Sequence, residues 1–468
     1  MNQLSWSTYT KILVVDFWSA SPHLETSLEI CLRLLKEGKE VYYLFLGDVV
    51  PLVECHWSTK RVDTGLSRVV SALSTKEKNN FKYVLLNDID TVADFVWPEF
   101  ACLQELKLYS WKLKPIGISA VSTITDLCKS DDIDFSRHDV QTLAIKALST
   151  FALAYEITTA TLHSYKPDAL VLFNGRFPSY AGSRYAAIDQ DIAVFYHERG
   201  ANPYCYSLKS NPPHDYWAFR NNCLAHAKRS FLDLLANESV SDHWFATRTK
   251  ISDNDIADTI CYLNERSSCN TIPGTIYSFF VSSTDELASL PSDTYPSHYW
   301  PSQITAICDL ISAICTIDSR ALLVIRLHPN MMNKDPDQIS RYNFLSLIEN
   351  VVLIEAQNKL NSYALAHVSK TVFTYMSTMG LEAAYMGRPV VTMAPAYYDF
   401  LRVTYPVKSY KELVRFLKCK DADYVPSSIS SIKMRCSLYS SFLTAPQEYY
   451  RYYKAQGSNS GTFLGAVL

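Results

Sequence analysis

The feature that most constrains the fold of this chain is a series of short apolar runs rich in Val, Ile, Leu and Phe. Segments with apolar residues at helical spacing separate most of these runs. Strands that are apolar at successive positions are buried on both faces, which is typical of parallel sheets covered by helices. We therefore predict an α/β protein. The runs are 11–17, 41–48, 81–88, 169–174, 192–200, 276–283, 321–327, 351–355, 370–376 and 389–393.

The length of the chain, 468 residues, is too great for one ordinary hydrophobic core. A turn-forming stretch, CNTIPGT, ends a polar helical region and precedes a new apolar run. We predict two doubly wound domains that face each other across a cleft, an N-terminal one over 1–270 and a C-terminal one over 271–445. Residues 446–468 are expected to form a helix at EYYRYYKA and then a loosely held tail.

Composition excludes several classes of protein. Apolar residues make up 48% of the chain and charged ones 19%, which argues against disorder, and a net charge of −3 gives no reason to expect nucleic acid. The 12 cysteines form no C-x-x-C pair, so we expect free thiols in a reducing compartment. The N-terminus is interpreted as a first strand, and no apolar run reaches the roughly 18 to 20 residues that span a bilayer. We expect a cytoplasmic protein, peripheral to the inner membrane at most.

Polar residues at strand ends are the candidates for ligand binding, because open parallel sheets bind ligands beyond the carboxyl ends of their strands. In the C-terminal half, Arg326 and His328 alternate with Leu327 and can share one side of a strand. Together they could neutralise and hydrogen-bond a phosphate, while Pro329, followed by Asn330, ends the ladder. The alternative is a surface turn with a solvated arginine.

A second strand in this half runs into Ser377 and Thr378, where a helix is expected to begin. No capping-box glutamate follows at the required spacing, and Gly380 costs the first turn roughly 1 kcal/mol relative to alanine. Close approach of a ligand to the backbone would explain that glycine, and the helix N-terminus would suit an anion. Glu382 could then bind ribose hydroxyls, or it could be an ordinary solvated carboxylate.

The N-terminal half supplies a second group of candidates at strand ends. A carboxylate beside cationic groups, as at Glu198, can act as a general base, nucleophile or acid, or can brace the loop through a salt bridge. Asp16, His23 and Glu25 could meet an acceptor, or Glu25 could simply serve the dipole of the helix that it opens. No metal motif is visible, and the Asp-rich stretches 87–90 and 130–134 are interpreted as solvated loops. The candidates that line this side are Asp16, His23, Glu25, Asn174, Gly175, Arg176, His197, Glu198 and Arg199.

Three motifs together resemble a known family. They are R-L-H-P at 326–329, N-S-Y-A-L-A at 361–366 and S-T-x-G-x-E-A-x-x-x-G-x-P-V-V at 377–391. This combination is similar to the nucleotide half of bacterial capsule polysaccharide biosynthesis proteins, a group that includes Kdo transferases and is similar in plan to bacterial sialyltransferases. The resemblance extends over about 275–395 and, more weakly, over 170–200.

The resemblance implies a GT-B fold, two Rossmann-like domains with donor and acceptor between them, and chemistry without a metal. It implies His328 and Pro329 on the donor phosphate, and Ser377, Thr378 and Glu382 around phosphate and ribose. The family's acidic pair falls on Glu198 and Arg199, so an arginine stands where a second acid is expected. The catalytic carboxylate is therefore Glu198, or else Asp189 or Asp191 just upstream.

The function expected on this basis is metal-independent glycosyl transfer in capsule or lipopolysaccharide assembly. The donor would be a nucleotide sugar, CMP-Kdo first, and the acceptor a glycan or lipid-linked glycan, with no cofactor and no nucleic acid. Other assembly enzymes at the inner membrane would be its neighbours. The alternatives are a UDP-sugar, GDP-sugar or CDP-glycerol donor, a non-catalytic subunit that binds nucleotide or glycan, and an epimerase on the same two-domain fold.

Overall fold

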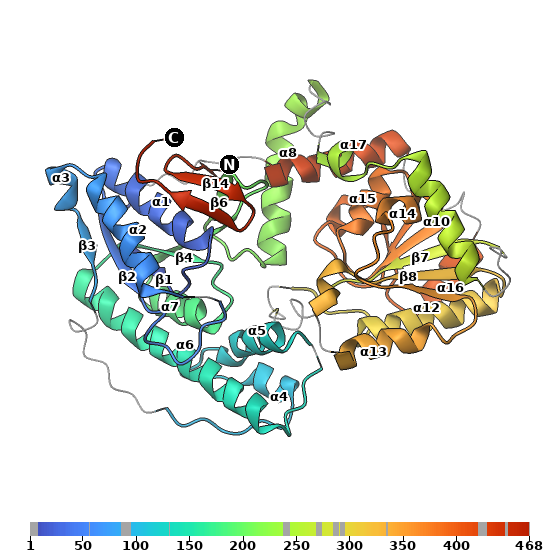
Figure 1. The fold of residues 1–468 in the computed structure, drawn as a ribbon, viewed down its shortest axis with the longest axis horizontal. Helices are drawn as coiled ribbons and strands as arrows, with labels where there is room; N and C mark the ends of the chain where they lie inside the picture. Colours follow the sequence, from blue (N-terminus) through green and yellow to red (C-terminus); the bar gives the residue numbers. More distant parts are fainter. Residues whose placement is uncertain are drawn as a thin grey trace. The chain divides into compact units, whose positions relative to one another are not determined.

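The fold of the protein is given by a computed structural model (Figure 1). The described residues are 8–55, 57–85, 95–130, 132–236, 244–267, 274–283, 290, 295–333, 336–419, 428–444 and 448–467. The chain divides into two compact units. Unit 1 comprises 1–215, 288–291 and 444–468, and unit 2 comprises 216–287 and 292–443.

Unit 1 is built on a seven-stranded sheet in the order β13-β6-β5-β4-β1-β2-β3. The five strands from β5 to β3 in this order are parallel, whereas β6 runs antiparallel to both β5 and β13. The strands are β1 (Lys11–Asp16), β2 (Glu40–Phe45), β3 (Phe81–Tyr83), β4 (Ala169–Phe173), β5 (Ala193–Arg199), β6 (Cys205–Lys209) and β13 (Glu448–Tyr449).

Both faces of this sheet are buried, which explains the continuous apolar runs. In β1, Ile12 and Val14 belong to the hydrophobic cluster on one face, and Leu13 and Val15 belong to the cluster on the other. All four side chains have no exposed surface. The helices of the unit are α1 (His23–Lys36), α2 (Thr59–Ser71), α3 (Thr75–Lys78), α4 (Leu103–Leu108), α5 (Ile116–Cys128), α6 (His138–Tyr165) and α7 (Pro178–Ile188).

Unit 2 contains a six-stranded, wholly parallel sheet in the order β12-β11-β10-β7-β8-β9. Its strands are β7 (Ile276–Phe280), β8 (Leu322–Arg326), β9 (Val351–Ile354), β10 (Thr371–Thr374), β11 (Val390–Thr392) and β12 (Tyr405–Pro406). Its helices are α8 (Tyr216–Ala236), α10 (Asp253–Arg266), α12 (Gln303–Ile317), α13 (Pro336–Leu345), α14 (Ser362–Val368), α15 (Met379–Tyr385), α16 (Tyr410–Lys418) and α17 (Ile429–Thr444), with 3-10 turns η3 (Pro329–Asn333) and η4 (Asp399–Leu401). The predicted α/β class with two Rossmann-like units is confirmed.

The polar helical region before the second sheet belongs to unit 2. The sequence places the domain boundary near 270, whereas the structure divides the chain between Asp215 and Tyr216. The reason is packing: the ring of Phe245 stacks on Tyr385 of α15, with 4.1 Å between the ring centroids. Cys223 and Leu263 lie in the same hydrophobic cluster as β8 and β10.

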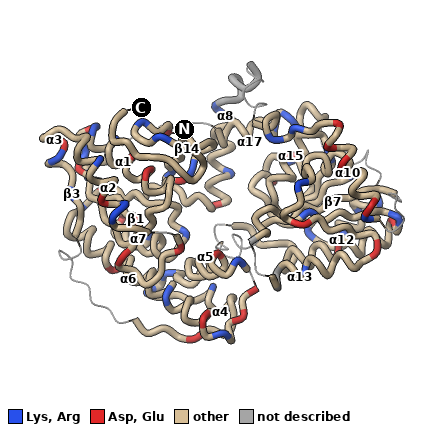
Figure 2. The backbone as a smooth tube through the Cα atoms, in the orientation of Figure 1, with Lys and Arg blue, Asp and Glu red and all other residues tan. Residues whose placement is uncertain are grey.

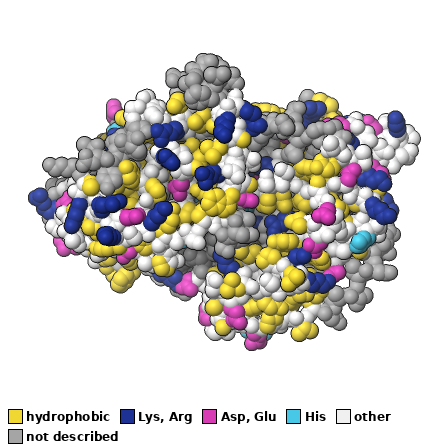
Figure 3. All heavy atoms as spheres, turned by 180° about the vertical axis from the view of Figure 1, so that it is seen from behind, with side chains coloured by type: hydrophobic (Ala, Val, Ile, Leu, Met, Phe, Trp, Pro, Cys, Tyr) yellow, Lys and Arg dark blue, Asp and Glu magenta, His cyan; other side chains and the backbone are white. Residues whose placement is uncertain are grey.

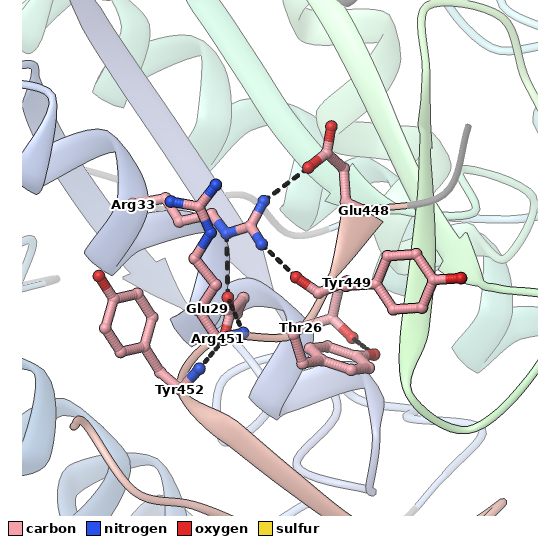
Figure 4. Close-up of polar contacts among 8 residues, drawn as sticks. Thr26, Glu29, Arg33, Glu448, Tyr449, Arg451 and Tyr452 are labelled. Carbon is pink, nitrogen blue, oxygen red and sulfur yellow. Dashed lines mark hydrogen bonds and ion pairs between the residues drawn. The ribbon is translucent and has the colours of Figure 1, made fainter. Parts of the chain in front are cut away.

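The tail is not a helix, so the helix predicted at 448–455 is wrong. Its residues form β13, then the hairpin of β14 (Tyr453–Gly457) and β15 (Ser460–Phe463), all within unit 1. The prediction of a loose tail is also wrong, because Phe463 is 3% exposed and its carbonyl accepts from Arg68 of α2 at 2.6 Å. The backbone N–H groups of Arg451 and Tyr452 donate to the buried carboxylate of Glu29 on α1, each at 2.8 Å (Figure 4). A tertiary contact therefore overrides the helical propensity of this segment.

On the face seen in Figure 3, hydrophobic side chains lie interspersed with charged and polar ones. Within the described ranges, no helix has both the length and the apolar character that crossing a bilayer requires.

Candidate functional site

The segments that carry the two C-terminal motifs leave the sheet of unit 2 at the same edge. Thr374 of β10 pairs with Phe280 of β7, and Phe280 pairs with Arg326 of β8, so the three residues form one row across the sheet. One strand separates β8 from β10, which corresponds to roughly 10 Å between their axes. The structure therefore brings the segments beginning at His328 and Ser377 to a common edge, beyond the carboxyl ends of parallel strands.

His328 is half-buried at this edge, and its ring orientation is defined by a backbone contact. The N–H of Asn330 donates to Nδ1 of His328 at 3.1 Å. Because Nδ1 accepts, a neutral His328 ring carries its proton on Nε2. Pro329 and Asn330 are exposed and begin the turn η3, so the strand ends where the sequence predicted. His328 can therefore offer an N–H donor to an anion.

Arg326 contributes to the edge in another way. It is 6% exposed, and its Nη1 and Nη2 donate to the carbonyl oxygens of Glu355 and Asn358 at 2.6 and 2.7 Å. Burial lowers the pKa of the guanidinium from its ordinary value. The solvated arginine considered as an alternative is thus wrong. Arg326 holds the loop that follows β9, and both of its terminal nitrogens are engaged there.

The hydroxyl of Ser377 accepts from the N–H of Met379 at 3.2 Å in the first turn of α15. Thr378 is exposed, and it caps the helix without a side-chain hydrogen bond. Tyr398 donates its hydroxyl to the carbonyl of Ser377 at 2.5 Å, which fixes the entry into the helix. One threonine hydroxyl is therefore exposed beside an ordered turn.

Gly380 and Glu382 both have structural partners. A Cβ on Gly380 would lie 2.4 Å from the Tyr398 hydroxyl and 2.8 Å from Cγ2 of Thr374, so close packing alone requires glycine here. Glu382 is 3% exposed, and it accepts from Arg248 Nε at 2.8 Å and from the Tyr363 hydroxyl at 3.0 Å. The alternative of a solvated carboxylate is wrong.

In unit 1, Asn174 organises the site at the ends of β4 and β5. Its backbone is left-handed, with φ of +53°, and its Oδ1 accepts the N–H of Arg176 at 3.1 Å. This turn directs Nδ2 toward Oε1 of Glu198, with which it hydrogen-bonds, and toward Nε2 of His214 at 3.2 Å. An amide nitrogen carries two hydrogens, so Asn174 can donate to both groups at once.

Burial raises the pKa of Glu198, while the hydrogen bond from Asn174 and the charge of Arg176 oppose that shift. Burial also lowers the pKa of His214 to about 3, so its ring is neutral and Nε2 is free to accept from Asn174. His214 was missed from the sequence, because it lies in the loop after the antiparallel strand β6 and not at the end of a parallel strand. Its position soon after a strand was the available signal.

Arg176 lies next to this carboxylate with part of its hydrogen-bonding capacity unused. Its Nε and Nη1 are buried and have no hydrogen-bond partner within the part of the chain that the structure describes. Its guanidinium carbon lies 4.7 Å from the centre of the Phe177 ring. A half-buried cation with unused donors is a candidate for binding an anionic group of a substrate.

Asp16 and His197 form a buried polar chain at the end of β1. Tyr43 and Ser27 donate their hydroxyls to Asp16 at 2.6 and 2.8 Å, and burial raises the pKa of Asp16 to about 7. Ser27 therefore accepts from Nε2 of His197 at 3.1 Å. Burial lowers the pKa of His197 to about 3, so its ring is neutral.

His23 and Glu25 on α1 are also buried and engaged. The His23 ring lies 4.0 Å, centre to centre, from Phe173, and burial lowers its pKa. Glu25 is 4% exposed, accepts from Ser21 at 2.9 Å and pairs with Arg61 at 2.5 Å. Glu25 therefore does more than serve the helix dipole.

Four predicted residues lie apart from this group or serve the backbone. Asp189 and Asp191 precede β5, roughly 20 Å or more along the strand from Glu198 at its far end. Asp189 accepts from Tyr155 and pairs with Lys114, each at 2.7 Å, and Asp191 is exposed. Arg199 is exposed at the end of β5, and Gly175 has a φ of +77°. The structure thus places one of the three candidate carboxylates, Glu198, at the carboxyl edge.

Among the described residues, no cluster of three or more His, Cys, Asp or Glu is arranged to hold a metal ion. The Asp-rich stretch 87–90 and residue 131 lie outside the described residues.

Comparison with known proteins gives one family match. Residues 297–419 match the model of the family described as capsule polysaccharide biosynthesis protein. This range includes the R-L-H-P motif, the N-S-Y-A-L-A motif and the helix start at Ser377. A search of the curated proteins finds no match.

Several solved structures are similar at low identity. A UDP-GlcNAc 2-epimerase from Neisseria meningitidis bound to UDP-GlcNAc is 15% identical over 92% of this chain and 96% of its own, with a TM-score of 0.29. KpsC from Thermosulfurimonas dismutans, a beta Kdo 2,7 transferase, is 11% identical over 60% and 79%, with a TM-score of 0.31. A protein from Anabaena in complex with UDP and glucose is 11% identical over 92% and 95%, with a TM-score of 0.30.

These scores are low, and the assignment of the fold rests on the two sheets described above. The resemblance predicted from the three motifs is confirmed by the family match, since each motif lies within the matched range. Residues 297–419 of this chain are similar to the capsule polysaccharide biosynthesis proteins.

Proposed function

We propose that this protein is a glycosyltransferase of bacterial surface-polysaccharide assembly that transfers a sugar, Kdo from CMP-Kdo, to a glycan acceptor. The observation that carries the proposal is the family match over 297–419 together with the register of the second sheet. That register brings the His328 and Ser377 segments to one edge of a parallel sheet, the position at which such sheets bind ligands.

His328 would bind the phosphate of the nucleotide. In the neutral ring Nδ1 accepts the N–H of Asn330 and Nε2 carries the proton, so Nε2–H is the group that would donate to a phosphate oxygen. The exposed hydroxyl of Thr378 supplies a further donor beside the ordered turn. A CMP leaving group is a monophosphate, and such donors stabilise the charge that develops when it departs. No cofactor is needed for this step, and no metal is proposed.

Glu198 would accept the proton of the attacking acceptor hydroxyl. A general base works best when its pKa lies close to the working pH, and burial shifts the pKa of Glu198 in that direction. Asn174 fixes the carboxylate, because the same amide is held by the N–H of Arg176. The unused nitrogens of Arg176 would receive an anionic group of the sugar or acceptor.

A non-catalytic subunit that binds nucleotide or glycan is the second candidate. Arg199 favours it, because this arginine stands where the resemblance predicts the second acid of the catalytic pair. Binding without turnover would distinguish this candidate from a transferase.

The test is titration calorimetry with CMP, UDP, GDP and CDP, followed by an assay for donor hydrolysis with CMP-Kdo. The proposal expects CMP to bind more tightly than the other three nucleotides, and it expects slow hydrolysis of the donor without acceptor. Preferential binding of UDP or GDP would indicate a UDP-sugar or GDP-sugar donor in place of CMP-Kdo. Preferential binding of CDP would favour a CDP-glycerol donor. Binding of CMP with no hydrolysis and no transfer would favour the subunit.

A further inference from the structure

A pocket of about 640 Å³ lies within unit 1, beside the start of α1. Its three walls are the first half of α1, the helix α2 and the C-terminal hairpin of β14 and β15. Pockets of this size hold ligands of a few sugar rings. Nothing in the proposed transfer step uses it, so its occupant has to be inferred from its lining.

The walls are held in place by hydrogen bonds between segments that are distant in sequence. Arg68 of α2 donates from Nη1 to the carbonyl of Phe463 at 2.6 Å. Arg61 of α2 pairs with Glu25 of α1 at 2.5 Å, and Ser21 contacts the hydroxyl of Tyr453 at 3.2 Å. The pocket is therefore shaped before any ligand enters, which lowers the entropic cost of binding.

The lining is polar and apolar in about equal parts, and most of its charged side chains are cationic. Lys60, Arg61 and Arg68 all come from α2, whose basic residues are blue in Figure 2, and the lining carries one carboxylate, Glu25. That carboxylate pairs with Arg61. No carboxylate forms an ion pair with Lys60 or Arg68 in the described ranges, so two positive charges remain uncompensated. The rest of the lining supplies hydroxyl and amide groups, including Ser58, Thr64, Gln456, Asn459, Ser460 and Thr462.

Hydroxyl and amide groups suit the many hydroxyls of a sugar, and apolar lining suits the C–H faces of its rings. Leu24 and Leu28 form apolar lining at α1, and a Cβ on Gly65 would lie 2.4 Å from a methyl group of Leu28, so this wall is closely packed. The two uncompensated cations favour a sugar that carries a carboxylate over a neutral one.

We propose that this pocket binds an acidic oligosaccharide, a segment of the glycan acceptor that carries carboxylate groups. The proposal rests on the proposed function in naming the acceptor, but the binding itself does not require transfer. It assigns the C-terminal hairpin a role in holding substrate, with Lys60 and Arg68 as the residues that select for charge.

The probe is trigalacturonate, with maltotriose as the neutral counterpart, and the readout is calorimetric affinity for the full chain. The variant K60A/R68A is expected to weaken trigalacturonate binding at least tenfold. The control K76A/K78A removes the same charge from the exposed side chains of α3, outside the pocket, and is expected to change the affinity less than twofold. Maltotriose is expected to bind at least tenfold more weakly than trigalacturonate to the unaltered protein.

An equal loss of trigalacturonate affinity in both double variants would contradict binding at this pocket, because nonspecific attraction by positive charge would then explain the binding. Absence of trigalacturonate binding, or equal affinity for maltotriose, would overturn it as well. CMP affinity and hydrolysis of CMP-Kdo are measured on the same protein. If the protein binds and hydrolyses CMP-Kdo but does not bind trigalacturonate, only the proposal for the pocket is contradicted. If it binds trigalacturonate but neither binds nor hydrolyses CMP-Kdo, only the proposed function is contradicted.

Discussion

The side-chain amide of Asn174 contacts two half-buried titratable groups at once, the carboxylate of Glu198 and Nε2 of His214. The contact to His214 measures 3.2 Å, and the amide is oriented because its oxygen accepts the N–H of Arg176 at 3.1 Å. A carboxylate held in this way, with its pKa raised by burial, has the properties of a general base.

Replacing Glu198 with glutamine should lower turnover by about two to four orders of magnitude, because the amide cannot accept the proton of the acceptor hydroxyl. CMP affinity should not change, since Glu198 lies in unit 1 and the proposed phosphate ligands lie in unit 2. The measurement is steady-state transfer with calorimetry alongside. The control is Asp191→Asn, at an exposed position before β5. If D191N loses activity and E198Q retains it, the base is misassigned.

Replacing His328 with alanine should weaken CMP binding about tenfold or more, because one donor to the phosphate is lost. The fold should persist, as the side chain is only half-buried. His367→Ala is the matched control, an exposed histidine on α14 of the same unit. Identical CMP dissociation constants in the two variants would remove the phosphate role from His328.

Replacing Gly380 with alanine should destabilise unit 2 by about 1–3 kcal/mol, because the new methyl would lie 2.4 Å from the Tyr398 hydroxyl. Tyr398→Phe removes that oxygen, and in the G380A background it should recover part of the loss in urea unfolding. CMP affinity of the double variant should match that of Tyr398→Phe alone. Loss of CMP binding in the well-folded double variant would show instead that a ligand approaches the backbone here.

Asp16 should make unit 1 less stable as the pH rises. Burial raises its pKa from 3.8 to about 7, so the folded state retains a proton that the unfolded chain releases. This contribution is fully present below the unfolded pKa and is lost as the pH rises through about 7, which amounts to at most about 4 kcal/mol. Asp16→Asn removes the titration but retains the shape of the side chain.

The measurement is the difference in free energy of unfolding between the wild type and D16N from pH 4 to pH 8. The wild type should lose stability relative to D16N across this range. The buried His197, whose pKa is lowered to about 3, acts in the opposite direction in both proteins, so the difference isolates Asp16. A difference that does not depend on pH contradicts the raised pKa.

Replacing Glu29 with glutamine should release the C-terminal tail. The carboxylate accepts from the N–H groups of Arg451 and Tyr452 and from Arg33, whereas glutamine has one oxygen and would point an NH₂ group at a donor. The expected cost is about 2–4 kcal/mol, together with faster tryptic cleavage at Arg451. Glu37→Gln, exposed at the end of the same helix, should leave both measurements unchanged.

The sequence alone was sufficient for the strands β1 to β5 and β7 to β11 and for the edges at which polar residues collect, but β6 and β12 were not predicted and β13 was predicted as part of a helix. Burial on both faces leaves a continuous apolar run, as in Ile12 to Val15, and the carboxyl ends of parallel strands must meet at one edge. These are local patterns, so His328, Asn174 and Glu198 could be identified as strand-end residues.

Only the tertiary structure decided which of those residues are engaged by the protein itself. Arg326 binds two carbonyls, Glu382 binds Arg248 and Tyr363, and the backbone of the tail binds Glu29, over separations of 19 to more than 400 residues. The partner in each case comes from a distant part of the chain, and no local pattern encodes it. The same reason explains why the tail was misread as a helix: its conformation depends on a carboxylate on α1.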